Sequence, residues 1–284
     1  MSQFTEVGSL REWVATERRR DRRIALVPTM GYLHEGHLSL VDEARRRADR
    51  VVMSIFVNPL QFGPHEDLDR YPRDLSRDSA LAADRGVDAL FVPVVAAMYP
   101  PGSETRVAPG AAAERWEGVA RPGHFLGVLT VVAKLFHIVQ PDLACFGQKD
   151  IQQAILIRQM VRDLDWPVEI AVAPIVREPD GLALSSRNVY LSPAERAEAP
   201  ALNTALRAAH DAWRAGETSA ARLEGLMRAQ LEVFSRVAVE YIAVAEPERL
   251  EPVPIASLGT VIAIAARLGR TRLIDNIILS REPV

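Results

Sequence analysis

Short apolar runs alternate with longer amphipathic stretches through the first two thirds of this chain of 284 residues. Such alternation is the pattern of parallel strands joined by crossover helices. The clearest unit is the pair of apolar runs at 24–27 and 51–57. Between them, residues 37–48 place Leu38 and Val41 at helical spacing, with arginines on the opposite face. We therefore expect a β-α-β unit near the start of an α/β fold.

The same pattern continues to about residue 172. Further strands are expected at 89–93, 143–146 and 168–172, and helices at 75–85, 127–139 and 151–164. Because the strands are separated by helix-length segments, the sequence predicts a Rossmann-like parallel sheet with helices on both faces.

The composition changes near Glu178-Pro179-Asp180-Gly181, where a turn signal precedes an Ala-, Arg- and Glu-rich stretch from 193 to about 235. We expect two helices in that stretch. Strand-like runs follow at 237–244, 260–266 and 272–279. The sequence therefore predicts a first domain over 1–178 and a small α+β domain with an antiparallel sheet over 179–284.

The charge balance bears on possible partners. The chain carries 34 basic and 37 acidic side chains, a formal net charge of −3, and one cysteine, Cys145. A general nucleic-acid binder normally has a basic excess, and the arginine runs 18–20, 22–23 and 45–47 are countered by Asp and Glu, which favours solvated helix faces. No intramolecular disulfide is possible, no apolar run reaches the roughly 18–20 residues that cross a bilayer, and no secretory signal opens the chain. We therefore expect a cytoplasmic protein with no nucleic-acid or membrane partner.

Residues 28–37 (PTMGYLHEGH) leave the carboxyl end of the first expected strand and enter a helix. Ligands of open α/β sheets bind at that edge, and a helix start offers unpaired N–H groups and a partial positive charge. Gly31 and Gly36 let a ligand approach the backbone. His34 and His37, three positions apart, share one helix face, where both imidazoles can donate hydrogen bonds to phosphate oxygens. The segment is consistent with a phosphate cradle.

Two other interpretations of the His-x-x-His pair are open. The two histidines are also consistent with a structural role, and a spacing of three suits a metal site. The zinc-protease pattern is missed by one residue, however, and no other His or Cys cluster offers a third ligand. Nucleotide binding is therefore favoured, with no metal ligands assigned.

A second segment, residues 181–188 (GLALSSRN), joins a flexible turn to two hydroxyls and a guanidinium. An arginine fork can hold two phosphate oxygens at once. Alone, Ser-Ser-Arg-Asn fits a helix-capping loop equally well. A His-x-Gly-His-like turn followed about 150 residues later by a Ser/Arg loop, however, resembles the HIGH and KMSKS signatures of the nucleotidylyltransferase superfamily, and we expect a HIGH-type nucleotidylyltransferase fold.

Read with its flanks, the chain resembles the pantothenate synthetase (pantoate–β-alanine ligase) family. The resemblance rests on PTMGYLHEGH (28–37), SIFVNPLQF (54–62), DLDRYPRDL (67–75), RPGHFLGVLTVVAKLFHIVQPD (121–142), FGQKDIQQ (146–153), DGLALSSRN (180–188) and ARLGRTRLIDN (266–276). It implies that ATP, with Mg²⁺, and (R)-pantoate give pantoyl adenylate and pyrophosphate, after which β-alanine attacks to give pantothenate and AMP. It also implies a homodimer formed through the first domain.

The resemblance assigns roles residue by residue. Adenylation needs charge stabilisation more than a protein nucleophile, so the expected catalytic residues are donors and cations: His34, His37 (the proton donor), Lys149, Ser185, Ser186 and Arg187. The implied ATP-binding residues are Met30, Gly31, Tyr32, Leu33, His34, Glu35, Gly36, His37, Gly147, Gln148, Lys149, Asp150, Val176, Leu184, Ser185, Ser186 and Arg187. Gln61 would bind pantoate and adjoin β-alanine, and Gln153 would bind pantoate.

Several of these residues have simpler interpretations. Gln61 alone is consistent with a loop residue that caps a strand end, and Gln153 with a solvated helix position. Asp67, Asp69 and Asp74 fit either Mg²⁺ coordination or a cap on the following helix. The chain also departs from the family in two places, because Gln148 stands where many relatives carry Glu and the Ser-Ser-Arg loop lacks the lysines of the KMSKS form.

Lysine occurs only at positions 134 and 149, so that 34 minus 2 leaves 32 arginines. Lys149 falls in the expected phosphate site, where a compact ammonium on a flexible stem can follow a phosphate during transfer. Lys134 lies on the helix expected at 127–139, and the sequence leaves its role open. Two other functions are weighed against the ligase: a nucleotidylyltransferase that stops at the adenylate or joins a nucleotide to a phosphate, and a tRNA-binding or regulatory relative without catalysis. The segment around Gln61 disfavours the first, and the charge balance disfavours the second.

Overall fold

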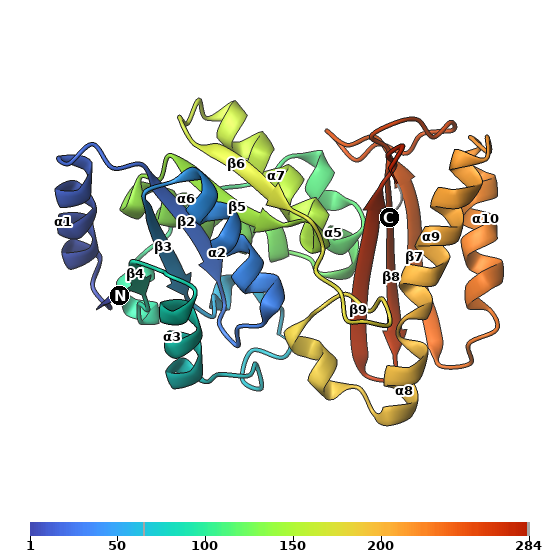
Figure 1. The fold of residues 1–284 in the computed structure, drawn as a ribbon, viewed down its shortest axis with the longest axis horizontal. Coiled ribbons are helices and arrows are strands. Elements are labelled where there is room, and N and C mark those ends of the chain that lie inside the picture. Colours follow the sequence, from blue (N-terminus) through green and yellow to red (C-terminus); the bar gives the residue numbers. More distant parts are fainter. Residues whose placement is uncertain (65, 283–284) are drawn as a thin grey trace. The chain divides into compact units, whose positions relative to one another are not determined.

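The computed structural model of the chain describes residues 1–64 and 66–282 and forms two compact units (Figure 1). Unit 1 comprises Met1–Gly147 and Leu156–Pro174, and unit 2 comprises Gln148–Ile155 together with the chain from Ile175 onward. Helix α7 (Ile151–Asp163) is divided between the two units, because its first residues belong to unit 2 and the rest belong to unit 1. The division of the chain into domains 1–178 and 179–284 remains a prediction.

Unit 1 is built on a parallel sheet of six strands. The strands are β1 (Ser2–Phe4), β2 (Ile24–Thr29), β3 (Arg50–Ile55), β4 (Ala89–Phe91), β5 (Leu143–Gly147) and β6 (Glu169–Ala173), in the order β1-β4-β3-β2-β5-β6. All neighbouring strands pair in parallel, which confirms the predicted sheet. Strand β1 was not predicted, because three residues at a sheet edge carry no detectable apolar period.

Helices cover both faces of this sheet, as predicted. The helices between β1 and β6 are α1 (Val7–Arg18), α2 (Glu35–Arg47), α3 (Leu75–Asp84), α4 (Val95–Met98), α5 (Glu117–Ala120), α6 (His124–Val139) and α7. On one face Ala25 and Val27 of β2 share a core cluster with Val41 of α2. Ile24 and Leu26, which are also completely buried, point to the opposite face. There α6 contacts β2, and α1 contacts α6.

Strand β5 carries the single cysteine of the chain. Cys145 is completely buried in the same core cluster as Val41 of α2. Burial raises the pKa of its thiol to about 12, because the thiolate would lose its hydration. The side chain is therefore a small apolar core group at neutral pH.

The strand order reverses at β2, which fixes where a ligand can bind. The chain runs from β2 outward to β3 and β4 on one side, and later to β5 and β6 on the other. Ligands of open α/β sheets bind beyond the carboxyl ends of the strands at such a switch point. The residues that follow Thr29 and the last residue of β5, Gly147, lie at that edge of unit 1.

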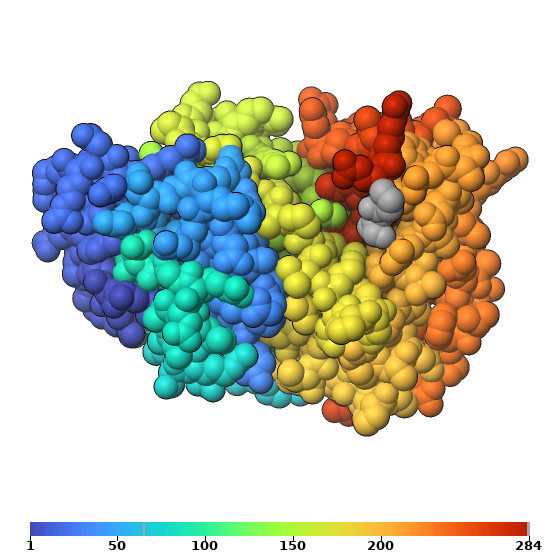
Figure 2. All heavy atoms as spheres, viewed as in Figure 1, coloured from blue at the N-terminus to red at the C-terminus, as the bar shows by residue number. Residues whose placement is uncertain are grey.

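Helix α2 forms part of the surface of unit 1 (Figure 2), and Arg45 and Arg46 in its last turn are exposed. Arg46 and Arg47 both form ion pairs with Glu43, and Arg47 also pairs with Glu169. Just beyond the end of α1, Arg20 pairs with Glu17 of that helix. These runs therefore lie among acidic partners. No helix within residues 1–64 and 66–282 combines the length and apolar character needed to cross a membrane.

Unit 2 contains the predicted antiparallel sheet, with strands β7 (Val237–Ala245), β8 (Val261–Leu268) and β9 (Thr271–Ile278) in that order. The expectation of two helices before it is wrong, because the structure has three: α8 (Pro193–Glu198), α9 (Ala201–Arg214) and α10 (Ala220–Leu231). Helix α8 begins at a capping box between Ser192 and Glu195. Pro200, which has no N–H to continue the ladder, separates α8 from α9.

Candidate active site

The turn that follows β2 is shaped by a buried carboxylate. Gly31 and Tyr32 both have positive φ angles, 84° and 51°. Asp78 of α3 is 1% exposed, and its two oxygens accept the N–H groups of Tyr32 and Leu33, each at 2.7 Å. A Cβ atom on Gly31 would lie 3.0 Å from Asp78 Oδ2, so glycine suits both the φ angle and the space. The carboxylate therefore holds the start of the His-containing segment in one conformation.

His34 and His37 cap the helix that they begin. The Nδ1 atom of His34 accepts the N–H of Gly36 at 3.1 Å, and the Nδ1 atom of His37 accepts the N–H of His34 at 3.3 Å. The two rings lie with their centroids 4.0 Å apart. Because both Nδ1 atoms accept, each neutral ring carries its proton on Nε2. The capping pattern thus fixes which nitrogen of each ring is a donor.

The expectation of unpaired N–H groups at this helix start is largely wrong. Besides the contacts above, the N–H of Gly31 donates to Thr29 Oγ1 at 3.2 Å, and those of His37 and Leu38 donate to the carbonyl of His34 at 2.8 and 3.1 Å. Short polar side chains and the first helical turn have therefore taken up most of the backbone donors. An anion bound here would meet mainly imidazole N–H groups and the helix dipole.

Gln61 lies in the short 3₁₀ helix η1 (Pro59–Gln61) that follows β3, and its side chain is buried. Its Nε2 atom contacts the sulfur of Met30 at 3.2 Å, and its Oε1 accepts from Asn58 Nδ2 at 3.0 Å. Unit 1 thus brings together two of the predicted site residues, Gln61 and Met30. The alternative interpretation, a loop residue that caps a strand end, is right about the position of Gln61, which follows β3. The side-chain amide of Gln61, however, is hydrogen-bonded to Asn58 and not to the strand.

The main-chain carbonyl of Gln61 is hydrogen-bonded to His124, the first residue of α6. His124 Nδ1 donates to the Gln61 carbonyl at 2.8 Å, and its Nε2 accepts from Arg121 at 3.1 Å. Burial, and after it the nearby guanidinium of Arg121, lower the pKa of His124 to about 4. The ring is therefore neutral at pH 7, with one donor and one acceptor both used. A Cβ on Gly127 would lie 2.2 Å from the carbonyl oxygen of Leu60, so only glycine permits this approach.

Lys134 lies close to a tyrosine that contacts Asn58, the residue that caps η1. Tyr99 donates its hydroxyl to Asn58 Oδ1 at 2.9 Å, and Lys134 Nζ lies 5.9 Å from the centroid of the Tyr99 ring. Burial raises the pKa of Tyr99, so its hydroxyl stays protonated and able to donate. Lys134 therefore lies beside the residue that orients Asn58, which in turn contacts Gln61.

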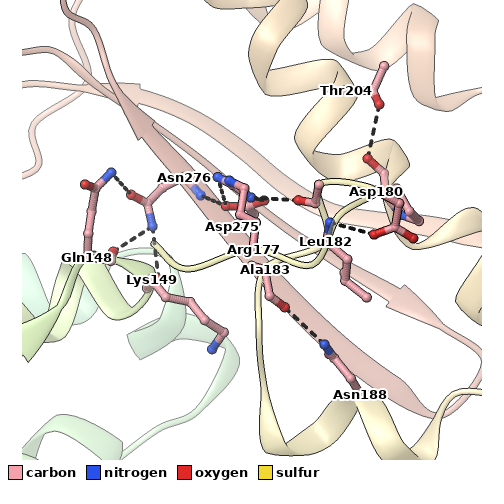
Figure 3. A network of polar contacts seen from close by, with 12 residues as sticks. Gln148, Lys149, Arg177, Asp180, Leu182, Ala183, Asn188, Thr204, Asp275 and Asn276 are labelled. Carbon is pink, nitrogen blue, oxygen red and sulfur yellow. Dashed lines mark hydrogen bonds and ion pairs between the residues drawn. The ribbon is translucent and has the colours of Figure 1, made fainter. Parts of the chain in front are cut away.

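In unit 2 the remaining site residues lie on two segments. Gln148–Asp150 form the 3₁₀ turn η3, and Gln153 lies on the first turn of α7. The ammonium of Lys149 lies 3.8 Å from Asp150 Oδ2, and its side chain is 22% exposed. Asn276 of β9 donates to the carbonyls of Gln148 and Lys149 (Figure 3). The turn that carries Lys149 is thus hydrogen-bonded to the sheet of unit 2.

The second segment, residues 176–188, is a hairpin that leads into a short 3₁₀ helix, η4 (Ser186–Tyr190). The N–H of Leu184 donates to the carbonyl of Val176 at 3.0 Å, and Gly181 turns the chain with a φ of 95°. Ser185 caps η4 by accepting the N–H of Arg187 at 3.3 Å, which confirms the capping interpretation. A capping hydroxyl still has a proton to donate, so the cap leaves a second role open.

The structure therefore groups the predicted site residues by unit. Unit 1 holds the segment 30–37, Gln61 and Gly147, while unit 2 holds η3, Gln153 and the segment 176–187. Of the three aspartates considered for Mg²⁺, Asp74 caps α3 by accepting the N–H of Arg77 at 3.0 Å. Within the described part of the chain, no group of three His, Cys, Asp or Glu side chains is arranged to hold a metal ion.

Sequence reasoning missed the residues that support these segments. They are Asn58, Asp78, Tyr99, Arg121, His124, Arg177, Asp275 and Asn276. Asp275 and Asn276 gave a signal, since a polar pair interrupts an apolar strand. Asp78 gave none, because an aspartate in the first turn of a helix is ordinary.

Comparison with known proteins places the geometry in a family. The family model described as "Pantoate-beta-alanine ligase" matches residues 2–278. A pantothenate synthetase from Moorella thermoacetica is 51% identical over 279 residues, which cover 98% of this chain and 99% of that protein. A pantothenate synthetase of known structure from Thermus thermophilus is 49% identical, with a TM-score of 0.94 over 98% of this chain and 99% of the other. The pantoate-beta-alanine ligase from Francisella tularensis, solved with "Beta-gamma ATP and Beta-alanine", is 33% identical, with a TM-score of 0.81 over 100% of both chains.

Proposed function

This chain belongs to the pantoate–β-alanine ligase family, and from that premise we propose which of its residues carry out each part of the reaction. The chain is a ligase that joins pantoate to β-alanine, with ATP as its third substrate. The observation that carries the proposal is the histidine pair at the carboxyl edge of the parallel sheet. Both rings have Nδ1 committed to the backbone, which leaves Nε2–H as the donor.

The reaction proceeds in two steps. A carboxylate oxygen of pantoate attacks the α-phosphorus of ATP, the bond to the β-phosphate breaks, and pyrophosphate leaves. The amine of β-alanine then attacks the acyl carbon of pantoyl adenylate, forms the amide and expels AMP, and the amine loses a proton. Both steps move negative charge onto phosphate oxygens, so fixed donors and cations would do most of the catalysis.

In unit 1, residues Met30 to His37 and Gly147 bind ATP. His34 and His37 donate through Nε2–H to phosphate oxygens, and His37 is the proton donor. The side chain of Gln61 binds pantoate and lies next to β-alanine. Its contacts with Met30 and Asn58 support this role, because they orient the amide before any ligand arrives.

In unit 2, the residues that bind ATP are Gln148, Lys149, Asp150, Val176, Leu184, Ser185, Ser186 and Arg187. Lys149 and Arg187 supply positive charge, the hydroxyls of Ser185 and Ser186 donate, and Gln153 binds pantoate. Mg²⁺ is usually held by phosphates plus one or two carboxylates, and Asp150, half exposed beside Lys149, fits that role. When bound, the ion would neutralise phosphate charge.

Three further assignments belong to the same proposal. The enzyme acts in the cytoplasm, where ATP is available and a reduced cysteine is normal. It is a homodimer formed through the first domain. Residues 1–178 are the domain that binds nucleotide and pantoate, and residues 179–284 carry the Ser-Ser-Arg loop at their start. Sedimentation of the purified chain tests the dimer, and a monomer at micromolar concentration would contradict it.

The test of the function is AMP release. We expect AMP and pyrophosphate to form in equal amounts when ATP, Mg²⁺, (R)-pantoate and β-alanine are all present, and little AMP when either acid is omitted. AMP release that requires some other acid would contradict the proposal. A free dinucleotide product would instead support a nucleotidylyltransferase that transfers to a phosphate.

A further inference from the structure

Strand β9 presents two adjacent buried polar residues to two different segments of unit 2. It is an edge strand of the three-stranded sheet, and among the described residues it pairs only with β8. Leu273 and Ile277 point into the core of unit 2, so Asp275, at the same phase of the strand, points to that face. Asn276 points to the opposite face. Asp275 is 4% exposed and Asn276 is 2% exposed, an unusual burial for adjacent polar side chains.

Asn276 binds the turn η3 with every polar atom of its amide. Its Nδ2 donates to the carbonyl oxygens of Gln148 and Lys149 at 2.9 and 3.0 Å, and its Oδ1 accepts from Gln148 Nε2 at 3.2 Å. In Figure 3 the side chain of Lys149 extends away from Asn276, so the contact is with the main chain. Asn276 thus fixes the backbone from which the ammonium of Lys149 projects.

Asp275 binds the second segment. Its carboxylate forms a two-point ion pair with Arg177, at 2.6 and 3.0 Å, and Arg177 also donates to the carbonyl of Gly181 at 3.1 Å. Arg177 and Ala183 form an antiparallel bridge at the base of the hairpin that leads to Ser185. Asp275 also accepts the N–H of Asn276 at 2.8 Å, which ties the two anchors together.

We propose that Asn276 is a positioning residue for Lys149, acting through the main chain of η3. Asn276 touches neither ATP nor pantoate in this role. It holds the Lys149 turn in register with the hairpin held by Asp275, so that the ammonium starts each turnover in its working position. The proposal rests on the phosphate-binding role proposed for Lys149. Misplacing a catalytic group by about 1 Å can cost about 10²-fold in rate, which makes such a support functionally visible.

The chemistry of the site specifies asparagine rather than aspartate. Two carbonyl oxygens of η3 need a donor, and the amide of Gln148 needs an acceptor, which only a carboxamide supplies together. The variant Asn276→Asp has nearly the same shape but turns an oxygen toward the carbonyls of Gln148 and Lys149. We expect the turn to move away from β9.

The test is the single-turnover rate of pantoyl adenylate formation, measured with enzyme in excess over ATP. We expect Asn276→Asp to lower that rate about 10- to 100-fold and to leave the KM for pantoate within about twofold. In a Lys149→Ala background the same substitution should change the rate by less than about twofold, because the group that it positions is absent.

Two control variants separate positioning from loss of stability. Leu273→Val trims the core face of the same strand, and Glu240→Gln removes the ion-pair partner that Arg272 of β9 has on β7. We expect Leu273→Val to lower the thermal midpoint while both variants keep the parent rate. A rate loss in Leu273→Val as large as that in Asn276→Asp would overturn the inference.

The remaining outcomes distinguish the inference from the proposed function. A loss of about 10²–10³-fold in Lys149→Ala with the parent rate in Asn276→Asp would overturn the inference alone. Additive losses in the double variant would do the same. A parent rate in Lys149→Ala would overturn both the role of Lys149 and the inference that depends on it.

Discussion

Each unit has a buried aspartate that supports a segment of predicted site residues, and the two aspartates do so by different chemistry. Asp78 in unit 1 accepts two backbone N–H groups, whereas Asp275 in unit 2 pairs with the guanidinium of Arg177. A carboxylate bound to N–H groups fixes the conformation of one turn. A carboxylate bound to a long charged side chain joins two distant segments, and removing either partner leaves the other charge buried and unpaired. We therefore expect the loss of Asp275 to lower the free energy of unfolding more than the loss of Asp78.

The largest expected effect is that of Asp275→Asn on stability. The substitution leaves the buried side of Arg177 without its counter-charge, and we expect the free energy of unfolding to fall by about 3–5 kcal/mol. Denaturant titration followed by circular dichroism measures the change. Burial raises the pKa of Asp275, and Arg177 opposes the rise, so the folded chain binds this proton before the unfolded chain does as the pH falls. Protonation of Asp275 in acid therefore does not by itself reproduce the loss caused by Asp275→Asn.

A double variant checks the cause of that loss. Replacing both partners, as in Arg177→Met with Asp275→Leu, removes the unpaired charge and should recover most of the lost stability. If the double variant is as unstable as Asp275→Asn, packing around position 275 rather than the ion pair accounts for the effect.

The next effect compares one donor from each unit. His37→Ala and Lys149→Ala should each lower the rate of adenylate formation about 10²–10³-fold, the usual scale for one preorganised donor or cation. If both act on the same transition state, the double variant should lose less than the product of the two losses. Single-turnover kinetics measure all three, and an unchanged rate in either single variant removes that residue from the chemistry.

A third effect concerns pH and unit 1 alone. The pKa of His124 is about 4 in the folded chain, below the ordinary value of 6.5, so the unfolded chain binds its proton first as the pH falls. The stability due to neutral His124 is complete above pH 6.5 and is lost between pH 6.5 and about 4, by about 3 kcal/mol. His124→Gln should lose that much less over the same range. Carboxylates that titrate there are common to both proteins and cancel in the difference, so equal profiles would contradict the prediction.

The smallest expected effect is that of Asp78→Asn. A carboxamide offers one acceptor to two N–H groups, so one of the donors of Tyr32 and Leu33 loses its partner, at a cost of about 1–3 kcal/mol. Denaturant titration measures this cost against that of Asp275→Asn. A loss at position 78 equal to or larger than that at position 275 would reverse the ranking of the two anchors.

The sequence predicted the helices and strands of both units well, because the spacing of apolar residues along the chain follows directly from which side chains are buried. The runs at 24–27 and 143–146 are found in β2 and β5, and the three late strands form the expected antiparallel sheet. It failed at α8, where Pro200 divides what composition presents as continuous helix. Composition averages over a window, whereas a missing N–H acts at one residue.

For the site, the sequence predicted residue types better than their surroundings. The spacing of His34 and His37 placed both on one face, but it could not show that their Nδ1 atoms cap the helix. Nor could it show that Asp78, far along the chain, takes the N–H groups expected to face a phosphate. Such contacts depend on which distant side chains the sheet order brings together, and a local pattern carries no record of that order.

The burial of Cys145 has a practical consequence for spectroscopy. A thiol with a pKa of about 12 inside β5 is almost entirely protonated at neutral pH, and maleimides react with the thiolate. A single cysteine introduced at Val189, which is 59% exposed on the 3₁₀ helix after the Ser-Ser-Arg loop, would therefore take a fluorophore alone. The natural sequence therefore needs no removal of cysteine before a fluorophore is attached to follow the motion of this loop.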